Sequence, residues 1–393
     1  MQKESEYLLS LMGDFLAGRE PSCLSDVDWN TLVKLSQIHC VTGILGYLVM
    51  QYPICPDESL RNALRTGCLQ TISLYTRRGL QMDQLIGELD RAGIRHILMK
   101  GYVLKDYYPV PELRTYGDID FVIAPEDRKK CHDLMLSLGF QVKTDWEPVY
   151  SYIRGQEFYE IHRDIMEVDV SDKADYRGYF ARMWEHTLAV QENTLHFTPE
   201  FHLLYLLTHI AKHIRGSGAG IRMYLDIGVF LRAKGEELDW EWIFRELKVL
   251  KLYDFARVVF TATEQWFGVK CPVDFPVVEN AVMAEFREYT LEAGLFGHFQ
   301  RESGLNALKQ EDTAEKTGRG RVLLGRMFPP AKQIETRYTY LQKRPWLLPA
   351  AWVHRFIKTR DSLAEHVHEA KVIFSAEEEE VERLRRIKMQ IGL

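Results

Sequence analysis

The chain has 393 residues, 46% of them hydrophobic and 27% charged, with a formal net charge of −6 at pH 7. This length allows two or three structural units, and the composition is that of an ordinary globular protein. The acidic balance disfavours extended nucleic acid as a partner, and no apolar run approaches the ~20 residues that span a membrane. The six cysteines form no CxxC pair and the first residues show no signal-peptide pattern, which predicts a cytoplasmic protein without a zinc site or a disulfide framework.

Residues 1–92 are predicted to form an N-terminal helical region. Leucine and methionine recur at helical spacing within residues 8–16, and Ser25 or Asp26 could cap a second helix. A long helix is expected from about Leu60 to Ala92. It should end at Gly93, because glycine adopts the left-handed conformation that closes many helices.

Residues 93–199 are predicted to form an α/β core, and residues 200–393 a C-terminal helical domain. In the core, short apolar or alternating runs indicate strands, and a segment beginning with proline and acidic residues indicates a helix. The last two strands are expected to pair as a hairpin around Arg163 and Asp164. The expected strands are 94–99, 118–123, 140–142, 158–162 and 166–170, the helix is 125–138, and the clearest later helices are 201–214 and 223–232.

Two acids lie at positions i and i+2 of one expected strand. Asp118 and Asp120 should therefore project from the same face, with Ile119 and Phe121 on the opposite, buried face. Two carboxylates on one face repel each other unless a cation lies between them, and hard oxygen ligands of this kind suit Mg²⁺. An Asp-x-Asp pair also occurs by chance at solvated strand ends, so the pair alone does not decide between a metal site and a surface.

The residues around this pair resemble a known family. The first block consists of Lys100-Gly101, Tyr108-Pro109, Arg114, Asp118-Ile119-Asp120 and Leu138-Gly139-Phe140, and a second block in the helical half consists of His209, Lys212-His213, Ile221-Arg222 and Asp226. The first block resembles the core of the polymerase-β-like nucleotidyltransferases, most closely the family of uncharacterised nucleotidyltransferases. The second block resembles the same family. The resemblance spans roughly residues 25–360. Lys100-Gly101 stands where the commoner subgroups of the superfamily have Gly-Gly or Gly-Ser.

The resemblance implies an α+β fold, in which a small mixed β-sheet core is wrapped by N- and C-terminal helical segments. It implies an enzyme that transfers an NMP group from an NTP, with ATP as first choice, to an acceptor and releases pyrophosphate. The acceptor is a small molecule, a peptide or a protein. The metal would be Mg²⁺, with Mn²⁺ as the alternative, held by Asp118, Asp120 and a third carboxylate. Glu160 is the first choice for that carboxylate and Asp169 its rival, while both could be exposed residues of a hairpin.

The resemblance also points to residues that would bind the nucleotide. Glycine at a strand-to-helix turn lets a phosphate approach the backbone, and a lysine beside it adds a positive charge. The plainer interpretation is a packing glycine beside a surface lysine. His209 and His213 share one helix face, for which a structural or substrate-side role is favoured over zinc. The residues expected to bind nucleotide are Lys100, Gly101, Arg114, Lys212, His213 and Arg222.

Two other function classes remain open from the sequence. Glycosyltransferases that use sugar nucleotides also carry an Asp-x-Asp pair with a divalent metal, but about ninety helix-like residues precede the first strand here. A non-catalytic nucleotide-binding or interaction protein could retain the fold and the acids. Binding of Mg²⁺ and NTP without turnover on any acceptor would favour the latter.

Overall fold

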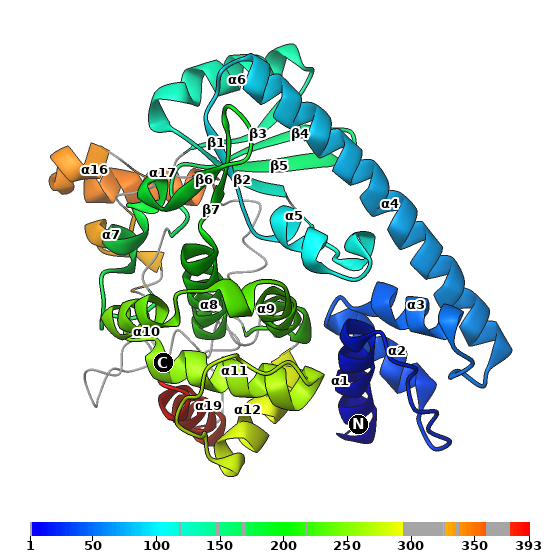
Figure 1. Ribbon diagram of the computed structural model, residues 1–393. Helices are drawn as coiled ribbons and strands as arrows, with labels where there is room; N and C mark the ends of the chain where they lie inside the picture. The colour runs from blue at the N-terminus through cyan, green and yellow to red at the C-terminus, as the bar shows by residue number, and fades with distance from the viewer. Residues whose placement is uncertain are drawn as a thin grey trace.

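The computed structural model describes residues 2–117, 119–146, 149–166, 170–216, 218–293, 325, 327–334, 338, 340–358 and 378–393. Its architecture is α+β, as predicted: one mixed sheet lies among helices contributed by both ends of the chain (Figure 1). Within the described residues, no helix is both long and apolar enough to cross a membrane.

Four helices form the N-terminal part of the chain, and two of them begin at side-chain caps. Asp28 accepts a hydrogen bond from the N–H of Asn30 (3.0 Å) at the start of the second helix, and Asp57 accepts one from Leu60 (2.7 Å) at the start of the fourth. The long helix ends at Arg91, and Gly93 follows its C-cap Ala92 with a φ of 61°, the left-handed conformation that glycine tolerates. The four helices are α1 (Gln2–Ala17), α2 (Trp29–Ile38), α3 (Thr42–Gln51) and α4 (Glu58–Arg91).

Among the described residues, the sheet has seven strands in the order β3-β4-β5-β2-β1-β7-β6. Of the pairs of adjacent strands, β2 with β5 and β1 with β7 are parallel, and the remaining pairs are antiparallel. The parallel pair β2–β5 lies at the centre of the sheet and carries the acids of interest. The strands are β1 (His96–Leu98), β2 (Ile119–Ile123), β3 (Gln141–Trp146), β4 (Val149–Arg154), β5 (Glu157–His162), β6 (Thr187–Ala189) and β7 (Thr194–Phe197).

The prediction of a hairpin around Arg163 and Asp164 is wrong. The antiparallel hairpin partner of β5 is β4, which precedes it, and residues 163–166 belong to no strand. Gly155, with a φ of 60°, lies in the two-residue turn between β4 and β5, where a positive φ suits the twist of a tight hairpin. The centre of the other expected strand, residues 167–169, lies outside the described residues.

Short helical segments connect the strands. The long connection between β1 and β2 consists of helical turns and precedes the segment that carries the acids, while α6 follows β2. These segments are α5 (Gly101–Leu104), η1 (Lys105–Tyr107), η2 (Pro111–Leu113), η3 (Pro125–Asp127), α6 (Arg128–Ser137), α7 (Tyr176–Phe180) and η4 (Met183–His186).

The two faces of the sheet belong to different hydrophobic clusters. Ile119, Phe121 and Ile123 of β2 pack in a cluster with Leu85 of α4 and Met135 of α6, all buried. Residues of the other face, such as Ile97 and Val122, belong to a second cluster formed mainly by the N- and C-terminal helices. Since alternate residues of a strand face opposite sides, Asp120 lies on the same face as Val122, toward those helices.

The C-terminal helices complete this second cluster. α11 contacts both α1 and α9, so helices from the two ends of the chain pack side by side below the sheet, and α4 runs from the sheet down to α3 (Figure 1). The helices are α8 (Pro199–Gly216), α9 (Ile221–Lys234), η5 (Gly235–Glu237), α10 (Trp240–Val249), α11 (Tyr253–Phe267), α12 (Asn280–Ala293), α15 (Ala331–Ile334), α16 (Tyr340–Lys343), η6 (Pro345–Leu347), α17 (Leu348–Lys358) and α19 (Glu378–Gln390).

Candidate active site

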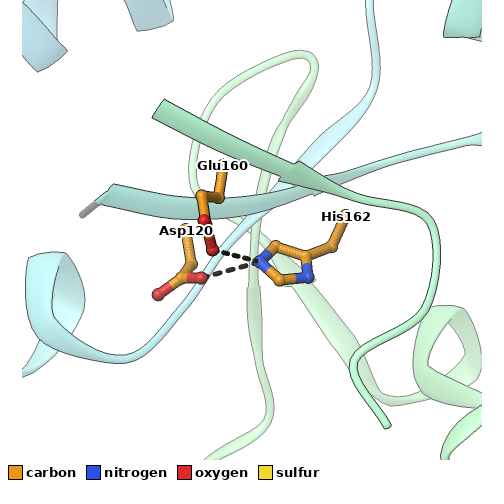
Figure 2. A group of neighbouring side chains, drawn as sticks. All are labelled: Asp120, Glu160 and His162. Carbon is orange, nitrogen blue, oxygen red and sulfur yellow. Dashed lines mark hydrogen bonds and ion pairs between the residues drawn. The ribbon is translucent and has the colours of Figure 1, made fainter. Parts of the chain in front are cut away.

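Asp120 and Glu160 face each other across the central parallel pair of strands. In the register of β2 and β5, Asp120 pairs directly with Glu160. Side chains that are direct neighbours on adjacent strands stand on the same face, so the two carboxylates project together. Figure 2 shows both side chains pointing from their strands toward the ring of His162.

His162 joins the two carboxylates. Its Nε2 lies 2.7 Å from Oδ1 of Asp120 and 3.9 Å from Oε2 of Glu160. An ionised carboxylate can only accept a hydrogen bond, so Nε2 of His162 carries a proton and donates a hydrogen bond to Asp120. The ligand atoms of the three residues lie within 4.8 Å of one another, and no other trio of His, Cys, Asp or Glu in the described part of the chain comes together so closely.

Lys100 supplies a positive charge on the other side of Asp120. Its Nζ lies 3.1 Å from Oδ2 of Asp120. Burial by itself would raise the pKa of the Asp120 carboxyl, but Lys100 and His162 outweigh that effect and hold the pKa well below its usual range. Asp120 is therefore a permanent anion at neutral pH.

The backbone at Lys100 and Gly101 is under tight local constraint. Lys100 has a φ of 51° and a ψ of −128°, a conformation that L-residues rarely adopt. Gly101 follows it at the start of α5, where an added Cβ would overlap Nη1 of Arg114 and meet its Cζ at 3.0 Å. The predicted strand-to-helix turn is present, and the space that Gly101 leaves is filled by the Arg114 guanidinium.

The donor set fits a divalent cation. Asp120 and Glu160 offer hard carboxylate oxygens, and His162 orients the Asp120 carboxylate through the hydrogen bond from its Nε2. The ammonium of Lys100 already occupies one flank of Asp120 as a counter-charge. Asp120, Glu160 and His162 thus form a candidate acidic metal site on a face of the sheet that is turned toward helices.

Comparison with known proteins decides the family. The sequence model of the family described as "Uncharacterised nucleotidyltransferase" matches residues 25–268, which include the whole sheet, the acidic trio and α8 to α11. The chain belongs to this nucleotidyltransferase family. The resemblance was expected to extend to about residue 360, and its part beyond residue 268 lies outside the matched range.

One similar chain was also found among solved structures. The solution structure of the antibiotic-resistance factor ANT(2'')-Ia matches with 13% sequence identity and a TM-score of 0.32, and the match covers 49% of this chain and 97% of that one. Among curated proteins, no significant sequence match was found.

All three guanidinium nitrogens of Arg114 donate hydrogen bonds to protein groups. Nε and Nη2 donate to Oδ1 and Oδ2 of Asp226 on α9, at 3.1 and 2.7 Å, and Nη1 donates to the carbonyl of Thr115 (3.2 Å). Tyr108 donates a further hydrogen bond to Asp226 (2.7 Å). Burial opposes the charge of Arg114, but Asp226 outweighs it and raises the Arg114 pKa further above its usual range. Arg114 therefore ties the segment before β2 to α9.

Arg222 lies beside this buried ion pair. Its Nη1 donates to the carbonyl of Thr115 (2.6 Å), while its buried Nε has no hydrogen-bond acceptor among the described residues. Burial, and then repulsion from Arg114, lower the pKa of Arg222. Thr115 thus accepts hydrogen bonds from two arginines just three residues before Asp118.

The histidines of α8 lie near the basic residues of the site. Nε2 of His209 and Nε2 of His213 are 3.1 Å apart. Burial, and then the charges of Lys212 and Lys100, lower the pKa of His213 to about 4, and burial with repulsion from His213 and Lys100 lowers that of His209 well below its usual value. Both rings are neutral at pH 7, and the charge of Lys100 contributes to keeping them so.

Two of the predicted acids cannot be compared with the structure. Asp118 and Asp169 both lie outside the described residues. Glu160, the first choice for a third carboxylate, lies beside Asp120. His162 was not among the residues predicted from the sequence. Its position two residues after Glu160 was the available signal, because alternation in a strand places both on one face.

Proposed function

We propose that this chain is a metal-dependent nucleotidyltransferase that moves an NMP group from an NTP, ATP in the first instance, to an acceptor. An acceptor oxygen would attack the α-phosphorus, the bond from that phosphorus to the oxygen bridging to the β-phosphate would break, and pyrophosphate would leave. The observation that carries the proposal is the direct pairing of Asp120 with Glu160 in a member of a nucleotidyltransferase family.

Asp120 and Glu160, with Asp118, are the residues proposed to hold Mg²⁺ or Mn²⁺. A bound divalent cation would neutralise charge on the phosphates and align them for in-line displacement. His162 supports this arrangement because it donates to Asp120 and fixes the direction of that carboxylate. Glu160, which is less buried than Asp120, is also placed to accept the proton that the attacking acceptor loses.

Three of the proposed nucleotide-binding residues carry positive charge: Lys100, Lys212 and Arg222. After burial, the charges of Lys212, Lys100 and Arg222 each lower the pKa of His213, which supports a positive electrostatic environment around that ring. A triphosphate would relieve repulsion among these cations. Arg114 takes a different part in the proposal, since its ion pair with Asp226 holds the segment that leads to the acids.

The proposed acceptor is a small molecule, a peptide or a protein side chain. The formal net charge of −6 disfavours an extended nucleic acid, which needs a basic surface. We place the reaction in the cytoplasm, and the six free cysteines support a reducing setting.

The first test is calorimetric titration of the four NTPs, each with and without Mg²⁺. Wild type should bind at least one NTP in a Mg²⁺-dependent manner, and Asp120→Asn and Glu160→Gln should both lose that dependence. Glu157→Gln is the matched control, because Glu157 lies on the same strand but three residues away and therefore on the opposite face. Its binding should resemble wild type.

Two results would contradict the proposal. Binding of a sugar nucleotide in place of all four NTPs would favour the glycosyltransferase alternative. Loss of binding in Glu157→Gln to the same extent as in Glu160→Gln would show that the acids act through folding rather than through a metal. After a positive result, release of pyrophosphate in the presence of candidate acceptors would identify the substrate.

A further inference from the structure

We propose that Lys100 is a built-in counter-ion of the acidic site, which competes with the divalent cation for Asp120 until the phosphates of the nucleotide draw the ammonium away. The inference rests on the proposed function and deepens it. It assigns an order to binding: the metal is held weakly by the free protein and tightly together with the nucleotide.

Both oxygens of Asp120 are already engaged by protein groups. Oδ2 faces the ammonium of Lys100 at 3.1 Å, and Oδ1 accepts from His162 at 2.7 Å. The side chains of Lys100 and Asp120 retain only 19% and 9% of their exposure, so solvent screens their attraction weakly. A cation that approaches Oδ2 must displace the ammonium or remain beside it against like-charge repulsion.

The backbone indicates that this placement of Lys100 is built into the fold. A lysine with φ of 51° and ψ of −128° costs conformational energy that glycine would not. Strained backbone persists where the surroundings hold it, and here the residue immediately precedes α5 and projects its side chain to Asp120 on β2. In this conformation Lys100 makes the ion pair with Asp120.

Nucleotide phosphates offer the ammonium an alternative partner. Lys100 also depresses the pKa values of His209 and His213 on α8, so its charge is felt on the helix side of the site as well as at Asp120. Movement of Nζ from Oδ2 toward a phosphate in this space would free the carboxylate for the cation. Metal and nucleotide would then bind with positive coupling.

The test is binding of Mn²⁺ alone, followed by electron paramagnetic resonance of the free ion, to wild type, Lys100→Met and Lys100→Gly. Both variants should bind Mn²⁺ roughly tenfold more tightly than wild type, because the competing charge is gone. Lys100→Gly also removes the backbone strain, so thermal unfolding should show it at least as well folded as Lys100→Met.

Lys105→Met is the matched control. Lys105 lies close by in the chain, its side chain is 21% exposed, and it pairs with Asp106 at 2.8 Å rather than with the acidic site. Its removal deletes the same charge and should leave the Mn²⁺ affinity at the wild-type value. Addition of ATP should tighten Mn²⁺ binding to wild type by a larger factor than to Lys100→Met.

The outcomes separate this inference from the proposed function. If Lys100→Met and Lys100→Gly bind Mn²⁺ no more tightly than wild type does, while ATP still tightens binding in wild type, the counter-ion role is overturned and the metal site stands. If no protein in the set binds Mn²⁺, with or without ATP, the proposed function itself is overturned.

Discussion

Arg114 and Asp226, 112 residues apart in the chain, form a two-pronged ion pair in the interior, with N–O distances of 2.7 and 3.1 Å. Their side chains are only 7% and 6% exposed. The pair connects the segment before β2, which leads to Asp120, with α9 of the helical half. The geometry of the acids therefore depends on a contact between distant parts of the chain.

Asp226→Asn should destabilise the protein by about 3–5 kcal/mol, because it leaves the buried charge of Arg114 without its counter-charge. Urea unfolding measures the free energy. The control is Asp254→Asn on α11, which breaks the pair with Arg257 at 2.9 Å, where the Asp254 side chain is 69% exposed. That change should cost within about 0.5 kcal/mol. Equal costs for the two variants would contradict a stabilising role of the buried pair.

Gly101→Ala should destabilise the protein by about 1–3 kcal/mol, because the new Cβ meets the Arg114 guanidinium, which Asp226 holds in place. Gly79→Ala is the control. Gly79 lies inside α4 with nothing near its added Cβ, so alanine should stabilise the helix by roughly 0.5–1 kcal/mol. Opposite signs are expected in the same chemical denaturation experiment, and a stabilising Gly101→Ala would disprove the packing argument.

His39 should make the protein less stable in mild acid. Burial lowers its folded pKa from 6.5 to about 4, and its Nδ1 accepts a hydrogen bond from the N–H of Ile221 (3.3 Å) at the start of α9. The unfolded chain therefore binds a proton that the folded chain excludes. Stability should fall as the pH drops from 6.5 toward 4, by up to about 1.4 kcal/mol per pH unit for this residue.

The contribution of His39 can be separated from those of other buried histidines. His202 and His213, with pKa values lowered to about 3 and about 4, act in the same direction. The measurement is the difference in unfolding free energy between wild type and His39→Gln across pH 4.5–8, and the acid sensitivity should shrink in the variant. The exposed His354, changed to Gln, should leave the slope unaltered. A parallel pH dependence of wild type and His39→Gln would refute the assignment.

His162→Ala should weaken Mg²⁺-dependent ATP binding by about 10–100-fold, because Asp120 loses the donor that orients it. His162→Gln should recover part of the loss, since an amide can still donate to Asp120. His132→Ala is the control, because His132 is also hydrogen-bonded, to the hydroxyl of Tyr152 at 2.9 Å, but on α6. Calorimetry that finds Gln no better than Ala would exclude an orienting hydrogen bond.

Local patterns in the sequence were sufficient to predict the elements that carry the site. The long helix α4 and its end at Gly93, the strand with Ile119 and Phe121 facing inward, and the projection of Glu160 from a neighbouring strand all follow from the periods of helix and strand. The same alternation contained the signal for His162. The family, too, was recognisable from two short blocks of residues.

Partners distant in the chain were decided by the tertiary structure. The parallel pairing of β5 with β2, the ion pair of Arg114 with Asp226, and the contact of Lys100 with Asp120 could not be inferred from spacing. A period shows which face a residue occupies, but the group that meets that face depends on how whole elements pack. The sequence by itself therefore determined which face of its strand Asp120 occupies, and only the tertiary structure decided that Lys100 and His162 are the charged and polar groups beside it.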